Sequence, residues 1–147
     1  LDLNWVQLMN AYSCTECGRC TNECPANQTG KKLSPRKIMM DTRDRLEKVS
    51  LNISKNKGEF IDDGDRLLDN YISKEELWAC TSCNACVEAC PINIDPLSII
   101  MDMRQYLIME ESSAHPDLNN MMNNIENNGA PWPYNQLDRE LWAQETQ

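Results

Sequence analysis

The sequence contains the stretch Cys80-Thr-Ser-Cys83-Asn-Ala-Cys86-Val-Glu-Ala-Cys90-Pro91. An earlier stretch has the same spacing, and it runs Cys14-Thr-Glu-Cys17-Gly-Arg-Cys20-Thr-Asn-Glu-Cys24-Pro25. Both follow the pattern C-x2-C-x2-C-x3-C-P, and together they contain all eight cysteines of the 147-residue chain. One such pattern could arise by chance, whereas two copies that also share the proline form a specific signal. We call these stretches the first and the second cysteine run.

The cysteine runs resemble those of ferredoxins that hold two [4Fe–4S] clusters, in which the fourth Cys of each run ligates the other run's cluster. Three thiolates spaced three residues apart can reach three irons of one cubane, and the proline stops that segment from continuing as a helix. The resemblance therefore implies two [4Fe–4S] cofactors. The first cluster would be ligated by Cys14, Cys17, Cys20 and Cys90. The second cluster would be ligated by Cys80, Cys83, Cys86 and Cys24.

Two other uses of the cysteines fit the pattern less well. A zinc site is expected as two C-x2-C pairs for each metal, or as a mixture of Cys and His, and it needs no third Cys at the next three-residue step. A disulfide framework is typical of small secreted chains, and we expect no secretory leader here.

The composition restricts the class of partner. The formal net charge is −9, and each oxidised cluster with its four thiolates would add roughly −2. We therefore expect no nucleic acid or anionic lipid as a partner, and a basic patch on another protein is favoured. No apolar stretch is long enough to span a bilayer, so we expect no membrane insertion by this segment. Reduced thiols on metal predict the cytoplasm, either free or on the cytoplasmic face of a membrane-bound complex.

Local signals predict mostly helix. Ser34-Pro35 and Asp95-Pro96 each combine an N-cap with proline at the first helical position, and Ser73 with Glu76 forms a capping box. The predicted helices are Leu1–Ser13, Pro35–Lys48, Ser73–Cys80, Pro96–Glu111, Pro116–Asn127 (closed by Gly129) and Asp138–Gln144. Residues 26–33 and most of 50–71 are predicted to be loop, with a short β-like piece at Glu59–Ile61 and a short helix at Arg66–Tyr71.

The internal repeat extends beyond the cysteines. Ser34-Pro-Arg-Lys-Ile38-Met-Met40-Asp41-Thr-Arg43 aligns with Asp95-Pro-Leu-Ser-Ile99-Ile-Met101-Asp102-Met-Arg104. This predicts two pseudo-symmetric halves, each built as helix, cluster run and helix. We therefore predict an all-α fold, an α-helical ferredoxin rather than the small α+β kind. It would occupy residues 1–112, and residues 113–147 would form a helical and extended connector towards an absent domain. Because the chain starts with Leu1, we also expect it to be part of something longer.

The residues around the runs suggest a family. The sequence has Leu-Ser-Pro-Arg-Lys at 33–37 and Glu-Leu-Trp-Ala-Cys at 76–80, and 55 residues separate Cys24 from Cys80. It resembles the α-helical ferredoxin domain of heterodisulfide-reductase-like iron–sulfur oxidoreductases. Relatives include the iron–sulfur subunits of glycolate oxidase and lactate utilisation and, more distantly, succinate dehydrogenase. The resemblance implies redox domains or subunits as partners, such as a cysteine-rich domain with a C-C-G signature, a flavoprotein or a membrane anchor.

The expected function is an electron-transfer relay through the two clusters, as a domain or subunit of a larger iron–sulfur oxidoreductase. With every Cys assigned to iron, no thiol is left as a nucleophile, no catalytic residue can be named, and we expect no substrate site of its own. The competing hypothesis is a structural or interaction module whose metal sites only stabilise the fold. A self-contained soluble ferredoxin is a third.

Of three flanking features, two allow more than one interpretation. Arg19, Lys31, Lys32, Arg36 and Lys37 form a basic island beside the first run, with only Glu23 as a counter-charge within it. The island is either solvated surface, or it docks an acidic partner or raises the potential of the neighbouring cluster. Trp78 is predicted to be a core residue, with shielding of the cluster as the alternative. His115 is predicted to be an ordinary surface residue.

Overall fold

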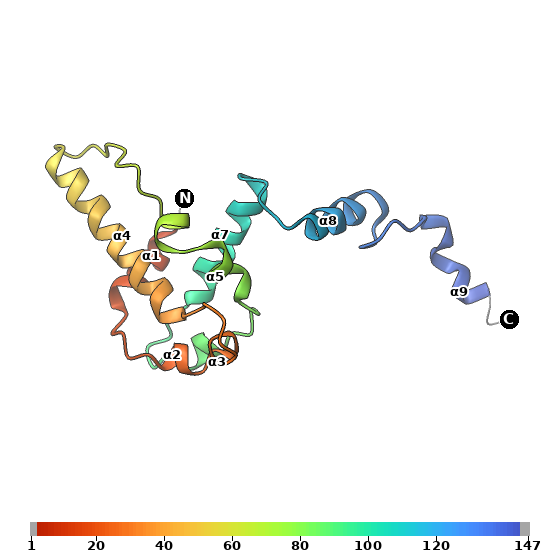
Figure 1. The fold of residues 1–147 in the computed structure, drawn as a ribbon, viewed down its shortest axis with the longest axis horizontal. Coiled ribbons are helices and arrows are strands. Elements are labelled where there is room, and N and C mark those ends of the chain that lie inside the picture. Colours follow the sequence, from red (N-terminus) through yellow and green to blue (C-terminus); the bar gives the residue numbers. More distant parts are fainter. Residues whose placement is uncertain (1–2, 145–147) are drawn as a thin grey trace. The chain divides into compact units, whose positions relative to one another are not determined.

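The computed structural model describes residues 3–144. It divides into two compact units, of which the first ends at Tyr106 and the second begins at Leu107, and each is described by itself. Within the described residues there is no strand, only an isolated bridge between Leu68 and Ile72. The prediction of an all-α fold is confirmed (Figure 1). The predicted boundary at 112/113 stays a prediction.

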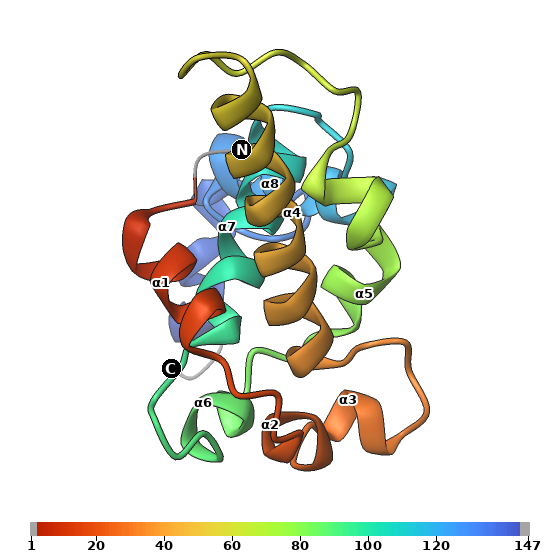
Figure 2. The same ribbon diagram turned by 90° about the vertical axis from the view of Figure 1, so that its left-hand side faces the viewer.

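The first unit is built from helices of very different length. Its elements are α1 (Trp5–Ser13), α2 (Arg19–Asn22), α3 (Pro25–Gln28), α4 (Pro35–Lys55), the irregular turn η1 (Leu67–Tyr71), α5 (Lys74–Ala79), α6 (Ala85–Glu88) and residues 96–106 of α7 (Pro96–Met109). The short helices α2, α3 and α6 gather at one end of the unit, beneath the longer α1, α4, α5 and α7 (Figure 2).

The predicted helix starts are confirmed, because capping depends on nearby side chains. The Ser34 hydroxyl accepts the Lys37 N–H at 3.3 Å at the start of α4, and Pro35 occupies the first helical position. Ser73 and Glu76 form the predicted capping box of α5. The Asp95 carboxylate accepts the Ser98 N–H at 3.0 Å before α7. For the predicted helix Leu1–Ser13, the first two residues lie outside the described part, and α1 begins after Asn4, which forms a capping box with Gln7.

The predictions were wrong in four places between the cysteine runs. The short helix predicted at Arg66–Tyr71 is interrupted, because Leu68 and Asp69 have non-helical backbone angles. Residues 26–33 are not all loop, because α3 extends to Gln28. Helix α4 continues past Lys48 to Lys55, since no helix breaker interrupts it before Gly58. The β-like piece at Glu59–Ile61 is no strand: the Asn52 side chain donates to Ile61 O (2.8 Å) and accepts from Ile61 N (3.0 Å), where a neighbouring strand would otherwise bond.

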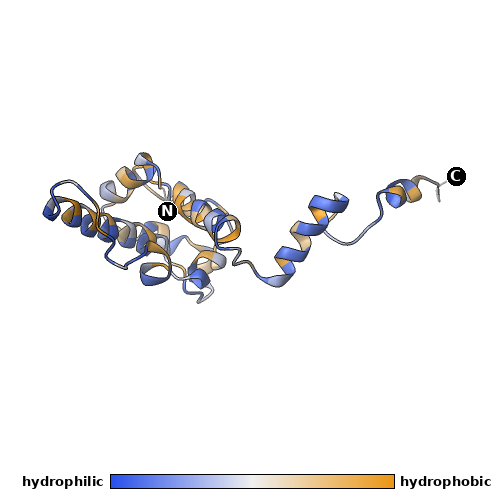
Figure 3. Cartoon of the chain, turned by 90° about the horizontal axis from the view of Figure 1, so that it is seen from above, coloured by the Kyte–Doolittle hydropathy of each residue, from blue (hydrophilic) through white to orange (hydrophobic). Residues whose placement is uncertain are grey.

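The apolar core of the first unit lies between α4, α5, α7 and the segment around η1. Its fully buried side chains include Leu33, Ile38, Met39, Leu68, Ile72, Leu77, Ile99, Ile100 and Met103. The helices carry hydrophobic and hydrophilic residues along their lengths (Figure 3). Ile38 and Ile99 are aligned positions of the internal repeat, so the two halves contribute to the core in the same way.

Polar side chains also join the helices of the first unit. Gln7 on α1 donates from Nε2 to the Asp102 carboxylate on α7 at 2.5 Å. Lys37 on α4 donates from Nζ to Asp41 (2.8 Å), to Glu76 (2.9 Å) and to the carbonyl of Tyr71 (3.0 Å). The third residue of each capped helix therefore also bonds to a helix of the internal repeat: Gln7 bonds to α7 and Glu76 bonds to α4.

We expect Glu76→Gln to lower stability at neutral pH by about 1–2 kcal/mol, because it leaves Lys37 and the Ser73 N–H without their anionic acceptor. Burial alone would raise the pKa of Glu76, but hydrogen bonds from Ser73 and Lys37 outweigh it and hold the pKa below its ordinary 4.5. The stabilisation is therefore complete above pH 4.5 and is lost as the pH falls through the lower pKa of the folded state.

Thermal unfolding midpoints of the wild type and Glu76→Gln, followed from pH 7 downwards, test this prediction. The gap between the two proteins should narrow on acidification. Glu75→Gln is the matched control, because Glu75 forms an exposed pair with Lys32 and should matter little. A gap that is constant with pH would contradict the assigned role of the Glu76 charge.

The second unit contains α8 (Pro116–Asn128), the 3-10 turn η2 (Gln136–Glu140) and α9 (Leu141–Gln144). Gly129 closes α8 in the left-handed conformation, as predicted. His115 is the N-cap residue of α8, because its Nδ1 accepts a hydrogen bond from the Asp117 N–H at 3.4 Å. No helix within residues 3–144 combines the length and the apolar character that crossing a bilayer requires.

Candidate metal centre

The two cysteine runs bend at equivalent positions. Glu16 and Ser82 each lie two residues after the first Cys of a run and have φ of 58° and 55°. Gly18 and Asn84 each follow the second Cys and have φ of 81° and 64°. Glycine and asparagine tolerate this left-handed conformation better than most residues. The predicted pseudo-symmetry of the halves therefore extends to the backbone of the two runs.

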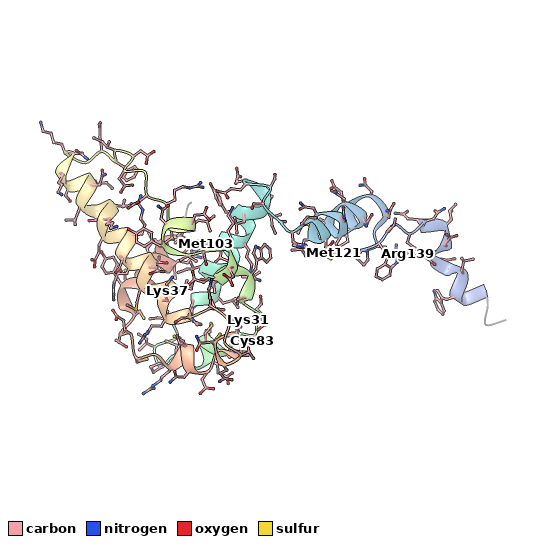
Figure 4. The ribbon with its side chains drawn as sticks, viewed as in Figure 1. Lys31, Lys37, Cys83, Met103, Met121 and Arg139 are labelled. Atoms are coloured by element: carbon pink, nitrogen blue, oxygen red, sulfur yellow. The ribbon has the colours of Figure 1, made fainter. Side chains whose placement is uncertain are left out.

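Each run then passes through one short helix, α2 or α6, in which the third Cys is the second residue. Helices α2 and α6 contact one another, and Cys83 lies at this end of the first unit (Figure 4). The third cysteines, Cys20 and Cys86, are therefore carried by neighbouring elements. The fourth cysteines follow each helix, and Pro25 begins α3 directly after Cys24.

The cysteines line two hollows, and each hollow combines both runs. The first hollow is lined by Cys14, Cys17 and Cys20 of the first run together with Cys86 and Cys90 of the second. The second hollow is lined by Cys80, Cys83 and Cys86 of the second run together with Cys24 of the first. The structure thus brings the fourth Cys of each run to the other run's first three. Cys86 lines both hollows.

Residues of the repeat helices form the walls of the hollows in a reciprocal way. The first hollow is walled by Arg36 and Met39 of α4, with Ile94 and Pro96. The second is walled by Leu97 and Ile100 of α7, with Leu33 and Pro35. These residues occupy four pairs of aligned positions in the internal repeat. Apart from Arg36 they are apolar. Cys24 and Cys86 are buried, whereas Cys17 and Cys83 are exposed.

The thiols differ in how readily they lose a proton. Burial raises the pKa of Cys86 to about 12, and the neighbouring Cys80 and Cys24 add to the effect. Burial also raises the pKa of Cys20. The pKa of Cys83 is lowered, chiefly by a hydrogen bond from the Ala85 N–H. Metal binding requires thiolates, so metal would have to displace the protons of the buried thiols.

Two further backbone groups donate hydrogen bonds to cysteine sulfur. The Ser82 N–H donates to Cys80 Sγ at 3.4 Å, and the Ile94 N–H donates to Cys90 Sγ at 3.3 Å. Within residues 3–144, no three His, Cys, Asp or Glu side chains are close enough to hold a single metal ion.

Two arginines at aligned repeat positions hold the cysteine runs, a role that local sequence patterns did not reveal. Arg104 on α7 donates to Leu77 O from Nε (3.0 Å) and Nη2 (2.6 Å), and to Cys80 O from Nη2 (2.5 Å). Arg43 on α4 is paired with the Glu16 carboxylate. The sequence did show that Arg43 and Arg104 occupy aligned positions of the internal repeat, but it did not show which groups they would contact.

Trp78 and the basic island differ from the expectations. Trp78 is 37% exposed, and the Arg104 guanidinium lies 5.1 Å from its ring centroid, so its assignment to the core was wrong. Lys32 and Lys37 form ion pairs with Glu75, Asp41 and Glu76. Folding brings Glu75 and Glu76 to the island from a distant segment, whereas Asp41 lies one turn after Lys37 on α4. Within the described residues, Arg19, Lys31 and Arg36 have no ion pair.

The region that contains the two cysteine runs resembles a known protein family, and the whole chain resembles parts of known proteins. Residues 13–94 match the family 4Fe-4S dicluster domain. The probable iron-sulfur-binding oxidoreductase FadF of Bacillus subtilis is 33% identical over 98% of this chain and 24% of its own length. The EtfAB:quinone oxidoreductase of Syntrophomonas wolfei is 29% identical over 98% of this chain and 23% of its own length. An iron-sulfur subunit of the CoB–CoM heterodisulfide reductase of Methanopyrus kandleri is 32% identical over 58% of this chain and 33% of its own length.

Proposed function

Because the chain belongs to the 4Fe-4S dicluster domain family, we propose that it relays electrons through two [4Fe–4S] clusters as part of a larger iron–sulfur oxidoreductase. The family holds two such clusters, which agrees with the eight cysteines of the sequence. The chain spans about a quarter of the length of the first two relatives. The activity of the whole protein would therefore depend on further parts.

The observation that carries the proposal is the crossed lining of the hollows. We assign Cys14, Cys17, Cys20 and Cys90 to the first cluster. We assign Cys80, Cys83, Cys86 and Cys24 to the second cluster. Four thiolates are the ligand set that [4Fe–4S] clusters take. When bound, each cluster would accept and release one electron at a time.

The chain's own residues would tune this exchange. The N–H groups of Ser82 and Ile94 would stabilise negative charge on ligand sulfur, and this favours the reduced state. Cys86 faces both hollows, so a ligand of the second cluster would lie beside the first. This arrangement supports passage of electrons within the domain.

The proposed partners are redox domains or subunits of the same assembly. A C-C-G-type cysteine-rich domain, a flavoprotein or a membrane anchor would each supply an electron donor or acceptor. Relatives that are named as oxidoreductases support this class of partner. We place the protein in the reducing cytoplasm, or on the cytoplasmic face of a membrane-bound complex, because the proposal needs eight reduced cysteines.

Anaerobic purification with iron and sulfide analysis tests the proposal. We expect about eight irons and eight sulfides per chain. On reduction with dithionite, EPR should detect two interacting reduced clusters, and reoxidation should restore the starting spectrum with helix content unchanged. Zinc without acid-labile sulfide would contradict the cluster assignment. Clusters that cannot be reduced reversibly would favour a module whose metal sites only stabilise the fold.

A further inference from the structure

The reciprocal walls of the two hollows differ in charge at one aligned pair. Arg36 on α4 lines the first hollow, whereas its counterpart Leu97 on α7 lines the second. The other aligned pairs are apolar on both sides, and they are Met39 with Ile100, Pro35 with Pro96, and Leu33 with Ile94. The internal repeat therefore introduces a cation at one site only.

A second difference accommodates Arg36. Its Nη1 lies 3.7 Å from the point where a Cβ on Gly18 would be, so the guanidinium covers the bend between Cys17 and Cys20. The Arg36 N–H also donates to Thr21 Oγ1 at 3.2 Å, which fixes the start of α4 against α2. The position equivalent to Gly18 in the second run is Asn84, which carries a side chain. Gly18, which has no side chain, and the cation Arg36 thus occur together in the first half.

The other charges near the cysteines do not cancel this asymmetry. Glu16 also lines the first hollow, but its carboxylate is paired with Arg43. Arg104, in the second half, binds carbonyl oxygens of Leu77 and Cys80 and does not line the second hollow. Among the described residues, Arg36 is the one cation that lines either hollow. A nearby cation stabilises added negative charge, and an added electron is such a charge.

We propose that Arg36 makes the first site the electron-accepting end of the relay, so that electrons move from the site of Cys80, Cys83, Cys86 and Cys24 to the site of Cys14, Cys17, Cys20 and Cys90. This inference rests on the proposed function. The relay thereby gains a direction. Arg36 would act through its charge, since no hydrogen bond among the described contacts joins it to a cysteine.

The test is an EPR-monitored redox titration of the anaerobic protein with both clusters present. The wild type should have two midpoint potentials. Arg36→Leu, which copies the second half, should lower the higher potential only. At a fixed potential the reduced fraction relative to the oxidised fraction should fall about tenfold, which is about 59 mV for a one-electron couple. The reciprocal Leu97→Arg should raise the lower potential only.

Two controls separate this effect from general changes of charge or fold. Arg36→Lys keeps the charge and should retain most of the wild-type potential. Lys31→Leu removes an exposed cation of the same basic island that lines neither hollow, and it should shift both potentials little. Iron content and the thermal unfolding midpoint report folding, and Leu97→Arg keeps the test available if Arg36→Leu loses iron.

The outcomes distinguish a failure of the role of Arg36 from a failure of the relay. If Arg36→Leu shifts the lower potential, shifts both equally or shifts neither, the role of Arg36 is overturned while the relay stands. The same holds if Leu97→Arg leaves the lower potential unchanged. If the wild type has no two reversible potentials, the proposed function itself fails.

Discussion

Replacing Cys24 with Ala should remove the second cluster and leave the first, although Cys24 belongs to the first cysteine run. Cys24 lines the hollow of Cys80, Cys83 and Cys86 and does not line the hollow of its own run. A [4Fe–4S] cluster needs its fourth ligand to stay intact, so the variant should retain about four irons and four sulfides. Metal analysis and EPR of the reduced variant give the measurement.

Cys17→Ala is the matched control, because Cys17 lines only the first hollow. It should leave the EPR signal of the second cluster, so the two variants should retain different signals. Cys90→Ala should resemble Cys17→Ala rather than Cys83→Ala, since Cys90 lines the first hollow. If Cys24→Ala and Cys17→Ala lost the same cluster, the ligands would not be exchanged between the runs.

Replacing Arg104 with Ala should destabilise the second cysteine run by about 3 kcal/mol. This is the largest effect that we expect from a substitution at a residue other than cysteine. Its guanidinium satisfies the carbonyls of Leu77 and Cys80, contacts the Trp78 ring and reaches the Ser82 hydroxyl at 3.4 Å. Hydrogen bonds from a charged donor contribute about 1.5–3 kcal/mol each. Loss of these bonds leaves the segment around the first Cys of the run without its anchor.

The rate at which a chelator removes iron measures this effect site by site. We expect iron loss from the second site to accelerate more than about tenfold, because tenfold corresponds to only about 1.4 kcal/mol. The first site should change little. The control is Arg43→Ala at the aligned position, where an ion pair with Glu16 of lower expected energy is removed. Equal acceleration at both sites would contradict a local role for Arg104.

The parts of this structure that depend on neighbours in the sequence could be predicted from it. Ser34 and Ser73 cap their helices as expected, because the bonded groups lie three residues away. The all-α fold followed from the repeat and the two cysteine runs, although the ligand pairing came from the resemblance to known ferredoxins. The spacing alone brings three cysteines of each run together.

The parts that depend on distant segments could not be predicted in this way. The β-like piece at Glu59–Ile61 was predicted wrongly, because nothing in residues 49–55 reveals that Asn52 will bond to Ile61. The basic island looked uncompensated, because its carboxylates Glu75 and Glu76 lie about forty positions along the chain. Likewise, Arg104 was visible as a repeated residue, but its contacts with Leu77 and Cys80 arise only from helix packing.

The crossed lining of the hollows has a consequence for biosynthesis. Cys90 lines the hollow of the first run, so this hollow cannot be completed on the ribosome until the codon for residue 90 has been translated. By then the second run is also present, and its own hollow needs Cys24, which emerged long before. The second hollow has all its cysteines once Cys86 has been made, only four residues before Cys90. Both sites become available within the synthesis of the same few residues, and a truncation just before Cys90 should leave neither the first site nor a stable fold.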